Sequence, residues 1–129
     1  MEIKKGTVCF IVSDGKVLLA LIQYPDGKRL WNGIGGIVDA DETPQQAVSR
    51  EISEETKLVV TEEHVKDVKT VEVGDLELHI LIATIWSGEE SIIDPTLKEL
   101  RWFDISDVPY DQMHVDNDKW LPEIFNHYK

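Results

Sequence analysis

Apolar residues recur in short runs separated by turn-forming dipeptides, a pattern typical of β-hairpins. The first two runs lie within residues 6–24 and flank Asp14–Gly15, a strong signal for a two-residue turn. Two further runs, at residues 64–73 and 76–86, are joined at Gly74–Asp75. The pattern therefore predicts two pairs of connected strands.

Two helices are predicted, one in the middle of the chain and one near its C-terminal end. The first begins at about Pro44, because Thr43 is a good N-cap, proline fits the first helical position and Gln46 completes a capping box. The second covers residues 117–128, where Pro122 must lie in the first turn or bend the helix.

The remaining segments complete the expected order of elements. Residues 25–36 are rich in turn-forming residues and are expected to form a loop. A short strand is predicted at residues 99–105, followed by a turn or short helical segment at 107–113. Strands, helix, strands and helix in this order predict one α/β domain over residues 1–129, built as a sandwich with a mixed sheet.

The composition fits one folded domain and excludes a class of partner. The chain has 129 residues, of which 42% are hydrophobic, enough for a single domain with its own core. Its formal net charge of −12 argues against binding nucleic acid polymers, which requires a basic surface. A small nucleotide remains compatible with this charge, because a bound cation can bridge two anions.

The sequence also carries expectations about the cellular compartment. The longest apolar run, Leu78 to Trp86, is too short to span a bilayer, and the N-terminal residues do not resemble a signal peptide. Cys9 is the single cysteine and lies within an apolar run, so it is expected to be a core residue in a reducing environment. We therefore expect a cytoplasmic protein without membrane contact, as a monomer or a homodimer.

Three glutamates share one face of the first predicted helix. Glu51, Glu54 and Glu55 are spaced i, i+3 and i+4, and like charges at this spacing destabilise a helix. A solvated acidic face would explain them, but no lysine or arginine is expected on that face, and the preceding segment, Gly33 to Gly36, suits close backbone approach. Carboxylates gathered in this way favour a hard divalent cation such as Mg²⁺ or Mn²⁺, which also binds phosphates.

This part of the chain resembles the signature of the Nudix hydrolases. The signature is a glycine, five residues, a glutamate, seven residues, and then Arg-Glu-aliphatic-any-Glu-Glu-any-Gly-aliphatic. Lys57 stands where the signature has its second glycine, which normally ends the helix in a left-handed conformation, so this departure concerns helix termination rather than chemistry. The other positions are matched by Gly36, Glu42, Arg50, Glu51, Ile52, Glu54, Glu55 and Leu58.

The resemblance implies a Nudix-type α/β/α sandwich and a metal-dependent hydrolase that cleaves a nucleoside diphosphate linked to another group. It implies Glu51, Glu54 and Glu55 as ligands of Mg²⁺ or Mn²⁺. Glu99 and the carbonyl of Gly35 are further candidate ligands, and Glu51 or Glu99 would act as the general base.

The same resemblance assigns supporting roles within the motif. Arg50 is expected to orient a glutamate through a two-pronged hydrogen bond, with Glu42 as a candidate partner. Gly36 and Glu42 then serve the structure of the motif. An ordinary surface ion pair is the simpler alternative for Arg50 and Glu42.

Two more segments resemble the MutT-type branch of the family. This branch converts oxidised purine nucleoside triphosphates, such as 8-oxo-dGTP, to the monophosphate and pyrophosphate. The segment "WNGIGG" is similar to the loop that precedes the signature in this branch, and "MHVDNDKWLP" lies where its base-reading segment would be. The resemblance therefore implies base contacts by Asn32, His114, Asp116 and Asn117, although a turn residue and a polar loop with a helix cap are the alternatives.

The phosphate-binding residues are less clearly marked. Many relatives carry lysine or arginine just after the second strand, where this chain has Ile22 and Gln23. Either Lys28 and Arg29 substitute for them, or the polyphosphate is held differently.

Three functions stay open at this point. The first is a MutT-type hydrolase of nucleoside triphosphates. The second is a Nudix hydrolase of another nucleotide diphosphate, such as a nucleotide sugar. The third is a nucleotide-binding sensor without catalysis, against which the complete set of carboxylates argues.

Overall fold

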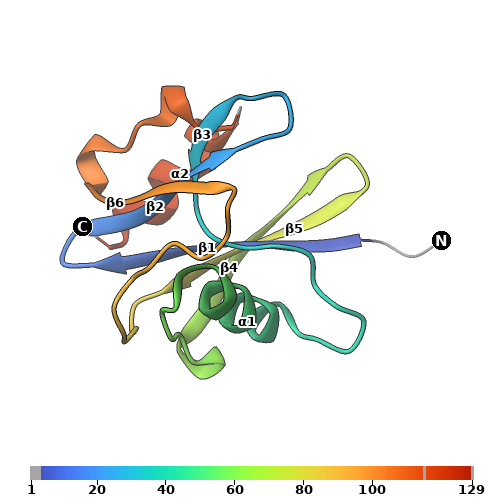
Figure 1. Cartoon of the computed structure of the whole chain (residues 1–129). Coiled ribbons are helices and arrows are strands. Elements are labelled where there is room, and N and C mark those ends of the chain that lie inside the picture. The colour runs from blue at the N-terminus through green and yellow to red at the C-terminus, as the bar shows by residue number, and fades with distance from the viewer. Residues whose placement is uncertain (1–3, 115, 129) are drawn as a thin grey trace.

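The computed structural model describes residues 4–114 and 116–128. In these residues the chain forms a six-stranded sheet, two α-helices and three 3₁₀ turns (Figure 1). The elements in chain order are β1 (Lys4–Ser13), β2 (Lys16–Gln23), β3 (Arg29–Asn32), α1 (Pro44–Thr56), η1 (Glu62–His64), β4 (Val65–Val73), β5 (Leu76–Ala83), β6 (Leu97–Asp104), η2 (Ile105–Asp107), η3 (Tyr110–Gln112) and α2 (Asn117–Asn126).

The sheet is mixed, as predicted. Its strand order is β3-β2-β1-β5-β4, with β6 paired to the other edge of β2. Strands β1 and β5 run parallel, whereas the other pairs are antiparallel. Both predicted hairpins form, at Asp14–Gly15 and at Gly74–Asp75, and three of these four residues have positive φ angles.

Strand β2 changes partners halfway along its length. Its first residues, Lys16 to Leu18, pair with the end of β1, and its later residues, Ala20 to Gln23, pair with β3. The prediction of a loop over residues 25–36 is therefore wrong at residues 29–32. This four-residue strand, β3, pairs with the later half of β2, which β1 does not reach. The strand is short and lies among turn-forming residues, so its alternation of apolar and polar residues is not recognisable in the sequence.

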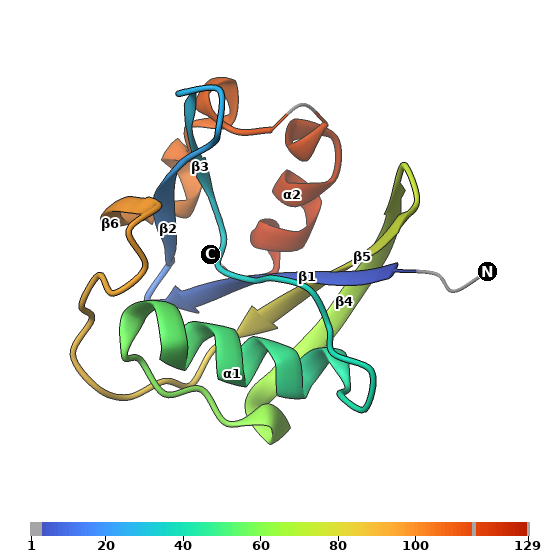
Figure 2. The same cartoon turned by 45° about the vertical axis from the view of Figure 1, so that its right-hand side comes forward.

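The two helices cover opposite faces of the sheet (Figure 2). Val48 and Ile52 of α1 pack against a core cluster that includes Cys9, Leu18 and Ala20. On the other face, Leu121 and Phe125 of α2 pack against a second cluster, which contains Phe10, Val12, Leu19 and Trp31. The predicted α/β/α sandwich is thus confirmed, and so is the expectation that Cys9 is a core residue.

Helix α1 begins as its sequence predicts and ends at the lysine that replaces the signature glycine. The hydroxyl of Thr43 accepts a hydrogen bond from the backbone N–H of Gln46, and the side chain of Gln46 accepts one from the N–H of Thr43. Lys57 follows the helix with φ 63° and ψ 3°, the left-handed conformation that the family signature normally gives to glycine.

Helix α2 departs from its prediction in one detail. Pro122 lies inside the helix, beyond its first turn, so the first of the two expected placements is wrong. The helix also ends at Asn126, before the predicted boundary. None of the helices in the described ranges 4–114 and 116–128 is long and apolar enough to cross a membrane.

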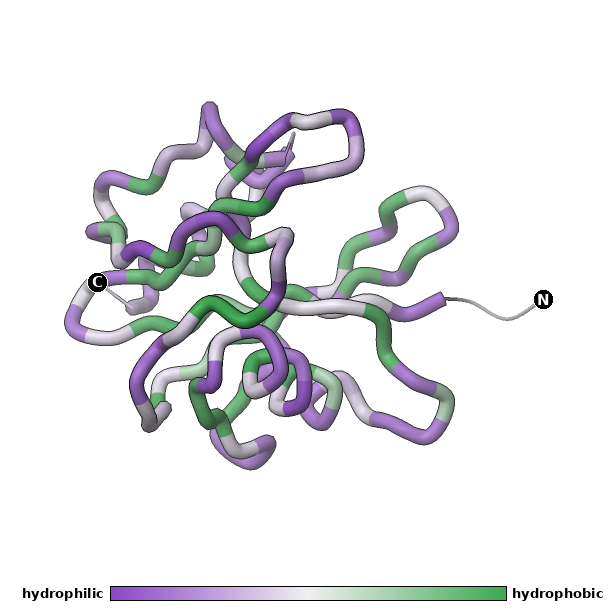
Figure 3. The backbone as a smooth tube through the Cα atoms, viewed as in Figure 1, coloured by the Kyte–Doolittle hydropathy of each residue, from purple (hydrophilic) through white to green (hydrophobic). Residues whose placement is uncertain are grey.

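Hydropathy along the backbone follows this architecture. Figure 3 shows hydrophobic stretches along the central strands and hydrophilic stretches at the turns that join them. The segment that follows β3 crosses these central strands next to α1 (Figures 1 and 2). It therefore brings Gly36 of the signature close to Glu51 of the helix.

Candidate active site

The glycine segment, residues 33–36, lies directly against β1. The N–H groups of Cys9 and Thr7 donate to the carbonyls of Ile34 and Gly36, both at 2.8 Å. A Cβ atom on Gly35 would lie 2.0 Å from the Thr7 carbonyl oxygen. The close approach of the two backbones therefore requires glycine here.

Gly36 leaves room for a carboxylate of α1. A Cβ atom on Gly36 would lie 2.8 Å from the carboxyl carbon of Glu51. The side chain of Glu51 is only 18% exposed, so it sits between the glycine segment and the helix. The signature glycine and the signature glutamate are thus in direct proximity.

Arg50 connects the carboxylates of this region. Its Nε and Nη2 donate to the two oxygens of Glu42 at 2.7 and 2.8 Å, the two-pronged geometry that the motif predicts. Hydrogen bonding to Arg50 lowers the pKa of Glu42 to about 2, and the carboxylates of Glu42 and Glu51 raise the pKa of Arg50.

The expectation that no cation pairs with the glutamate face is wrong. Arg50 Nη1 lies 2.7 Å from Glu51 Oε1 and 3.5 Å from Glu54 Oε2. The physical reason is the reach of the guanidinium, which binds Glu42 on one side and the two α1 glutamates on the other. Arg50 and Glu54 are also four residues apart, the spacing of neighbours on a helix.

Glu55 has an oxygen without a partner. Its Oε2 is buried and makes no hydrogen bond. Burial, together with the carboxylates of Glu51 and Asp94, raises the pKa of Glu55 to about 8. An orphaned, desolvated carboxylate oxygen is costly unless a proton or a cation satisfies it.

The donor chemistry of this region fits a hard divalent cation. Glu51, Glu54 and Glu55 offer carboxylate oxygens from one helix, and the Oε2 of Glu55 has no hydrogen-bond partner in the protein that would compete with a cation. In residues 4–114 and 116–128 no three His, Cys, Asp or Glu side chains are already gathered as a metal cluster. Arg50 contacts two of the three carboxylates, those of Glu51 and Glu54.

Glu99 does not join the α1 glutamates. It pairs with Leu21 on the sheet face that α2 covers, whereas its neighbour Leu100 packs toward α1. Its carboxylate binds Arg101, with Nε to Oε2 at 2.7 Å. Successive strand residues point to opposite faces, so the expected metal and base roles of Glu99 have no geometric support.

Sequence reasoning missed Asp94. This residue lies in the loop before β6, where its Oδ1 accepts hydrogen bonds from the backbone and the hydroxyl of Thr96, both at 2.8 Å. The N–H of Ile93 donates to the carbonyl of Glu55 at 3.1 Å, which ties the loop to α1. The Asp94-Pro95-Thr96 turn was the available signal, but only the fold shows that it meets Glu55.

The four predicted base-contact residues line one cavity of about 660 Å³. They come from the end of β3 and from the segment that leads into α2. Asp116 precedes α2 but makes no capping hydrogen bond, and instead binds Lys119 at 2.8 Å. The lining includes Asn32, His114, Asp116, Asn117, Lys119, Trp120, Val8 and Leu78.

A second cavity, of about 420 Å³, lies next to the first. It is lined by the glycine segment, Glu55, Tyr24 and Thr96. Asn32 lines both cavities. The predicted base-contact residues and Glu55 of α1 therefore line neighbouring cavities.

The two residues expected to bind phosphate, Lys28 and Arg29, lie outside the two cavities of the site. Lys28 lines a third cavity of about 460 Å³, together with Tyr24 and His114. The Nε of Arg29 donates to the Oε1 of Gln23 at 3.0 Å, beside β2. Neither cation is among the residues that line the two cavities of the site.

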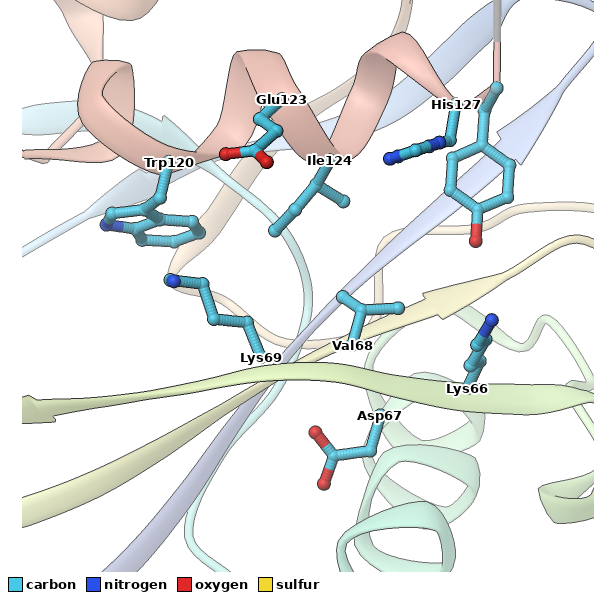
Figure 4. Close-up of a pocket in the computed structure, with 9 residues that line it drawn as sticks. Lys66, Asp67, Val68, Lys69, Trp120, Glu123, Ile124 and His127 are labelled. Atoms are coloured by element: carbon cyan, nitrogen blue, oxygen red, sulfur yellow. The ribbon is translucent and has the colours of Figure 1, made fainter.

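One further cleft, of about 520 Å³, separates α2 from β4. Figure 4 shows Lys69 of β4 extending toward Trp120 of α2 across this cleft. Trp120 also borders the base cavity. None of the residues predicted for metal or substrate binding lines this cleft.

A model of the NUDIX domain matches residues 3–124. The chain belongs to the Nudix family. This Nudix hydrolase is 38% identical over 122 residues to an oxidized purine nucleoside triphosphate hydrolase from Danio rerio, an alignment that covers 90% of the chain and 76% of the relative. A protein of the same name from Mus musculus is 30% identical over 127 residues, with 95% and 80% covered.

The Nudix fold is also matched by solved structures. The MutT Nudix hydrolase from Burkholderia pseudomallei superposes with a TM-score of 0.76 at 26% identity, covering 99% of this chain and 98% of that one. The agreement extends over the whole domain, which confirms both the family and the predicted architecture.

Proposed function

We propose that this Nudix hydrolase cleaves purine nucleoside triphosphates, including oxidised ones such as 8-oxo-dGTP, to the monophosphate and pyrophosphate. The observation that carries the proposal is the pair of neighbouring cavities that share Asn32. A nucleotide with its base in the larger cavity would extend its phosphates toward Glu55 and the glycine segment. The names of the Danio rerio and Mus musculus relatives support the same substrate class.

The larger cavity offers groups that suit a purine edge. Amide side chains such as Asn32 and Asn117 can donate and accept hydrogen bonds, and the carboxylate of Asp116 accepts from ring or amino N–H groups. Val8 and Trp120 supply apolar surface for the faces of the base. A base with the wrong pattern would leave buried polar groups unpaired, which is the main source of discrimination.

The proposed cofactor is Mg²⁺ or Mn²⁺, held by Glu51, Glu54 and Glu55, with the Gly35 carbonyl as a further candidate. When bound, the metal neutralises phosphate oxygens and acidifies water for attack on phosphorus. Because burial keeps Glu55 protonated near neutral pH, its carboxyl must lose a proton to become a ligand. Metal binding to this chain should therefore release a proton.

Arg50 acts as a positioning residue in this account. Glu42 holds the guanidinium through two hydrogen bonds, and the guanidinium in turn holds Glu51 beside Gly36. Glu51 is the proposed general base, since Glu99 lies on the other face of the sheet.

The proposal includes the setting in which the enzyme works. A net charge of −12 favours small nucleotides with their cations over nucleic acid polymers. The single buried cysteine agrees with a cytoplasmic location. The enzyme would act there as a monomer or a homodimer.

A screen of nucleotides for phosphate and pyrophosphate release, with Mg²⁺ and with EDTA, tests the proposal. We expect purine nucleoside triphosphates to yield pyrophosphate with Mg²⁺ and nothing with EDTA. Glu54→Gln should reduce turnover by orders of magnitude with the fold intact, whereas Asp116→Ala and Asn117→Ala should mainly reduce base selectivity. Release from nucleotide sugars alone would indicate the second function, and nucleotide binding without any release would indicate a sensor.

A further inference from the structure

Tyr24 joins two segments of the base cavity from outside it. This residue follows β2, and its hydroxyl lies 2.6 Å from Nε2 of His114, which is 90 positions further along the chain. The two rings also meet edge to face, with centroids 5.0 Å apart and planes at 84°. Tyr24 lines the neighbouring cavity together with Asn32, so it touches two residues that line the base cavity.

The hydrogen bonds around Tyr24 form a directed chain. The Oδ1 of Asn32 accepts from the N–H of Gly33 at 2.8 Å, which fixes the amide with its nitrogen free to donate. Burial raises the pKa of Tyr24, and hydrogen bonding by the Asn32 side chain partly offsets this rise. A hydroxyl that accepts from an amide has its own proton available for Nε2 of His114.

This chain sets the donors that the cavity presents. If Nε2 of His114 accepts from Tyr24, the neutral ring carries its proton on Nδ1. The second N–H of the Asn32 amide also remains unused by the chain. With this tautomer, His114 Nδ1 and the Asn32 amide are two donors left for a ligand, and Asp116 lines the same cavity with an acceptor.

We propose that Tyr24 is a specificity-determining positioning residue, which orients Asn32 and His114 so that they donate to acceptor atoms of a purine base. The inference rests on the proposed function and deepens it. Tyr24 does not itself line the base cavity, so it acts through the residues it holds. Its hydroxyl orients the two polar side chains, and its ring packs against the ring of His114, a contact that does not require the hydroxyl.

Tyr24→Phe removes the hydroxyl and keeps the ring, so it is the direct test. We expect KM for a purine nucleoside triphosphate to rise by about 3- to 10-fold, the loss of one oriented hydrogen bond. The preference for purine over pyrimidine substrates should fall by a similar factor, with kcat changed by no more than about twofold. Tyr110→Phe is the matched control, because Tyr110 is also partly buried but lines none of the three cavities around the site.

His114→Phe provides a second variant, which keeps an aromatic ring and removes the Nε2 acceptor. It should reduce purine selectivity in the same direction as Tyr24→Phe. Binding of dGMP in metal-free buffer, measured by calorimetry, gives a readout that does not depend on catalysis. We expect Tyr24→Phe to weaken this binding by the same factor as KM, and Tyr110→Phe to leave it unchanged.

The outcomes separate the inference from the function on which it rests. A purine-selective wild type whose selectivity and dGMP affinity survive Tyr24→Phe would overturn the role of Tyr24 and leave the proposed function standing. A loss confined to kcat would overturn it too, because orientation of the base acts on binding. A wild type that neither binds dGMP nor prefers purines would overturn both.

Discussion

Replacing Glu55 by glutamine removes a titrating group that destabilises the metal-free fold near and above neutral pH. Burial, together with the carboxylates of Glu51 and Asp94, raises the pKa of Glu55 from its ordinary value of 4.5 to about 8. The folded state therefore binds this proton more tightly than the unfolded state. The resulting stability is complete below about pH 4.5 and is lost as the pH rises to about 8.

The size of the effect follows from the pKa and the exposure. A carboxyl whose pKa rises from 4.5 to about 8 corresponds to at most about 5 kcal/mol. The side chain is only partly buried, so solvent screening should reduce this to about 1–2 kcal/mol. Glutamine has nearly the same shape and stays neutral, so the variant should not lose stability for this reason.

Urea unfolding of metal-free protein between about pH 5.5 and pH 8.5 measures the difference. The free energy of unfolding of Glu55→Gln minus that of the wild type should grow by about 1–2 kcal/mol as the pH rises through this range, because only the wild type loses stability there. Glu99→Gln is the control, because Glu99 is ion-paired at the surface with Arg101. A difference that stays constant with pH, or grows as the pH falls, would refute the reasoning.

Three further predictions concern the motif. Lys57→Gly should raise the free energy of unfolding by up to about 1 kcal/mol, because Lys57 has a φ of 63°; a loss in urea unfolding would contradict this. Arg50→Lys cannot form the two-pronged bond to Glu42, so kcat should fall at least about tenfold, while Arg101→Lys should leave kcat unchanged. Gly35→Ala should destabilise the fold by about 3 kcal/mol or more, since its Cβ would lie 2.0 Å from a backbone oxygen. Gly6→Ala, whose Cβ would meet only a leucine side chain at 3.2 Å, should cost less in the same urea unfolding assay.

Features with a local cause could be predicted from the sequence. The capping residues of α1, the turns at Asp14–Gly15 and Gly74–Asp75, and the shared face of the glutamates each depend on residues a few positions apart. Helical spacing and turn chemistry are sufficient for such features. The sequence left the conformation of Lys57 open, because a lysine in place of the signature glycine could also have made the helix exit by another route; the structure shows the left-handed conformation.

Features that depend on pairing between distant segments could not be predicted. Strand β3 pairs with the part of β2 that β1 does not reach, and no pattern in the sequence indicates where β2 changes from one partner to the other. The face on which Glu99 lies depends on its register with β2, where a shift of one residue would reverse it. The contact of Tyr24 with His114 and the approach of Asp94 to Glu55 likewise require the folded chain.

One competition experiment tests the central claim most directly. Equal amounts of a purine and a pyrimidine nucleoside triphosphate are incubated with the enzyme in one tube, with Mg²⁺ or with EDTA, and the products are separated by chromatography. The account predicts that the purine nucleotide is converted first, to its monophosphate and pyrophosphate, and only with Mg²⁺. Equal conversion of the two nucleotides, or conversion in EDTA, would contradict it.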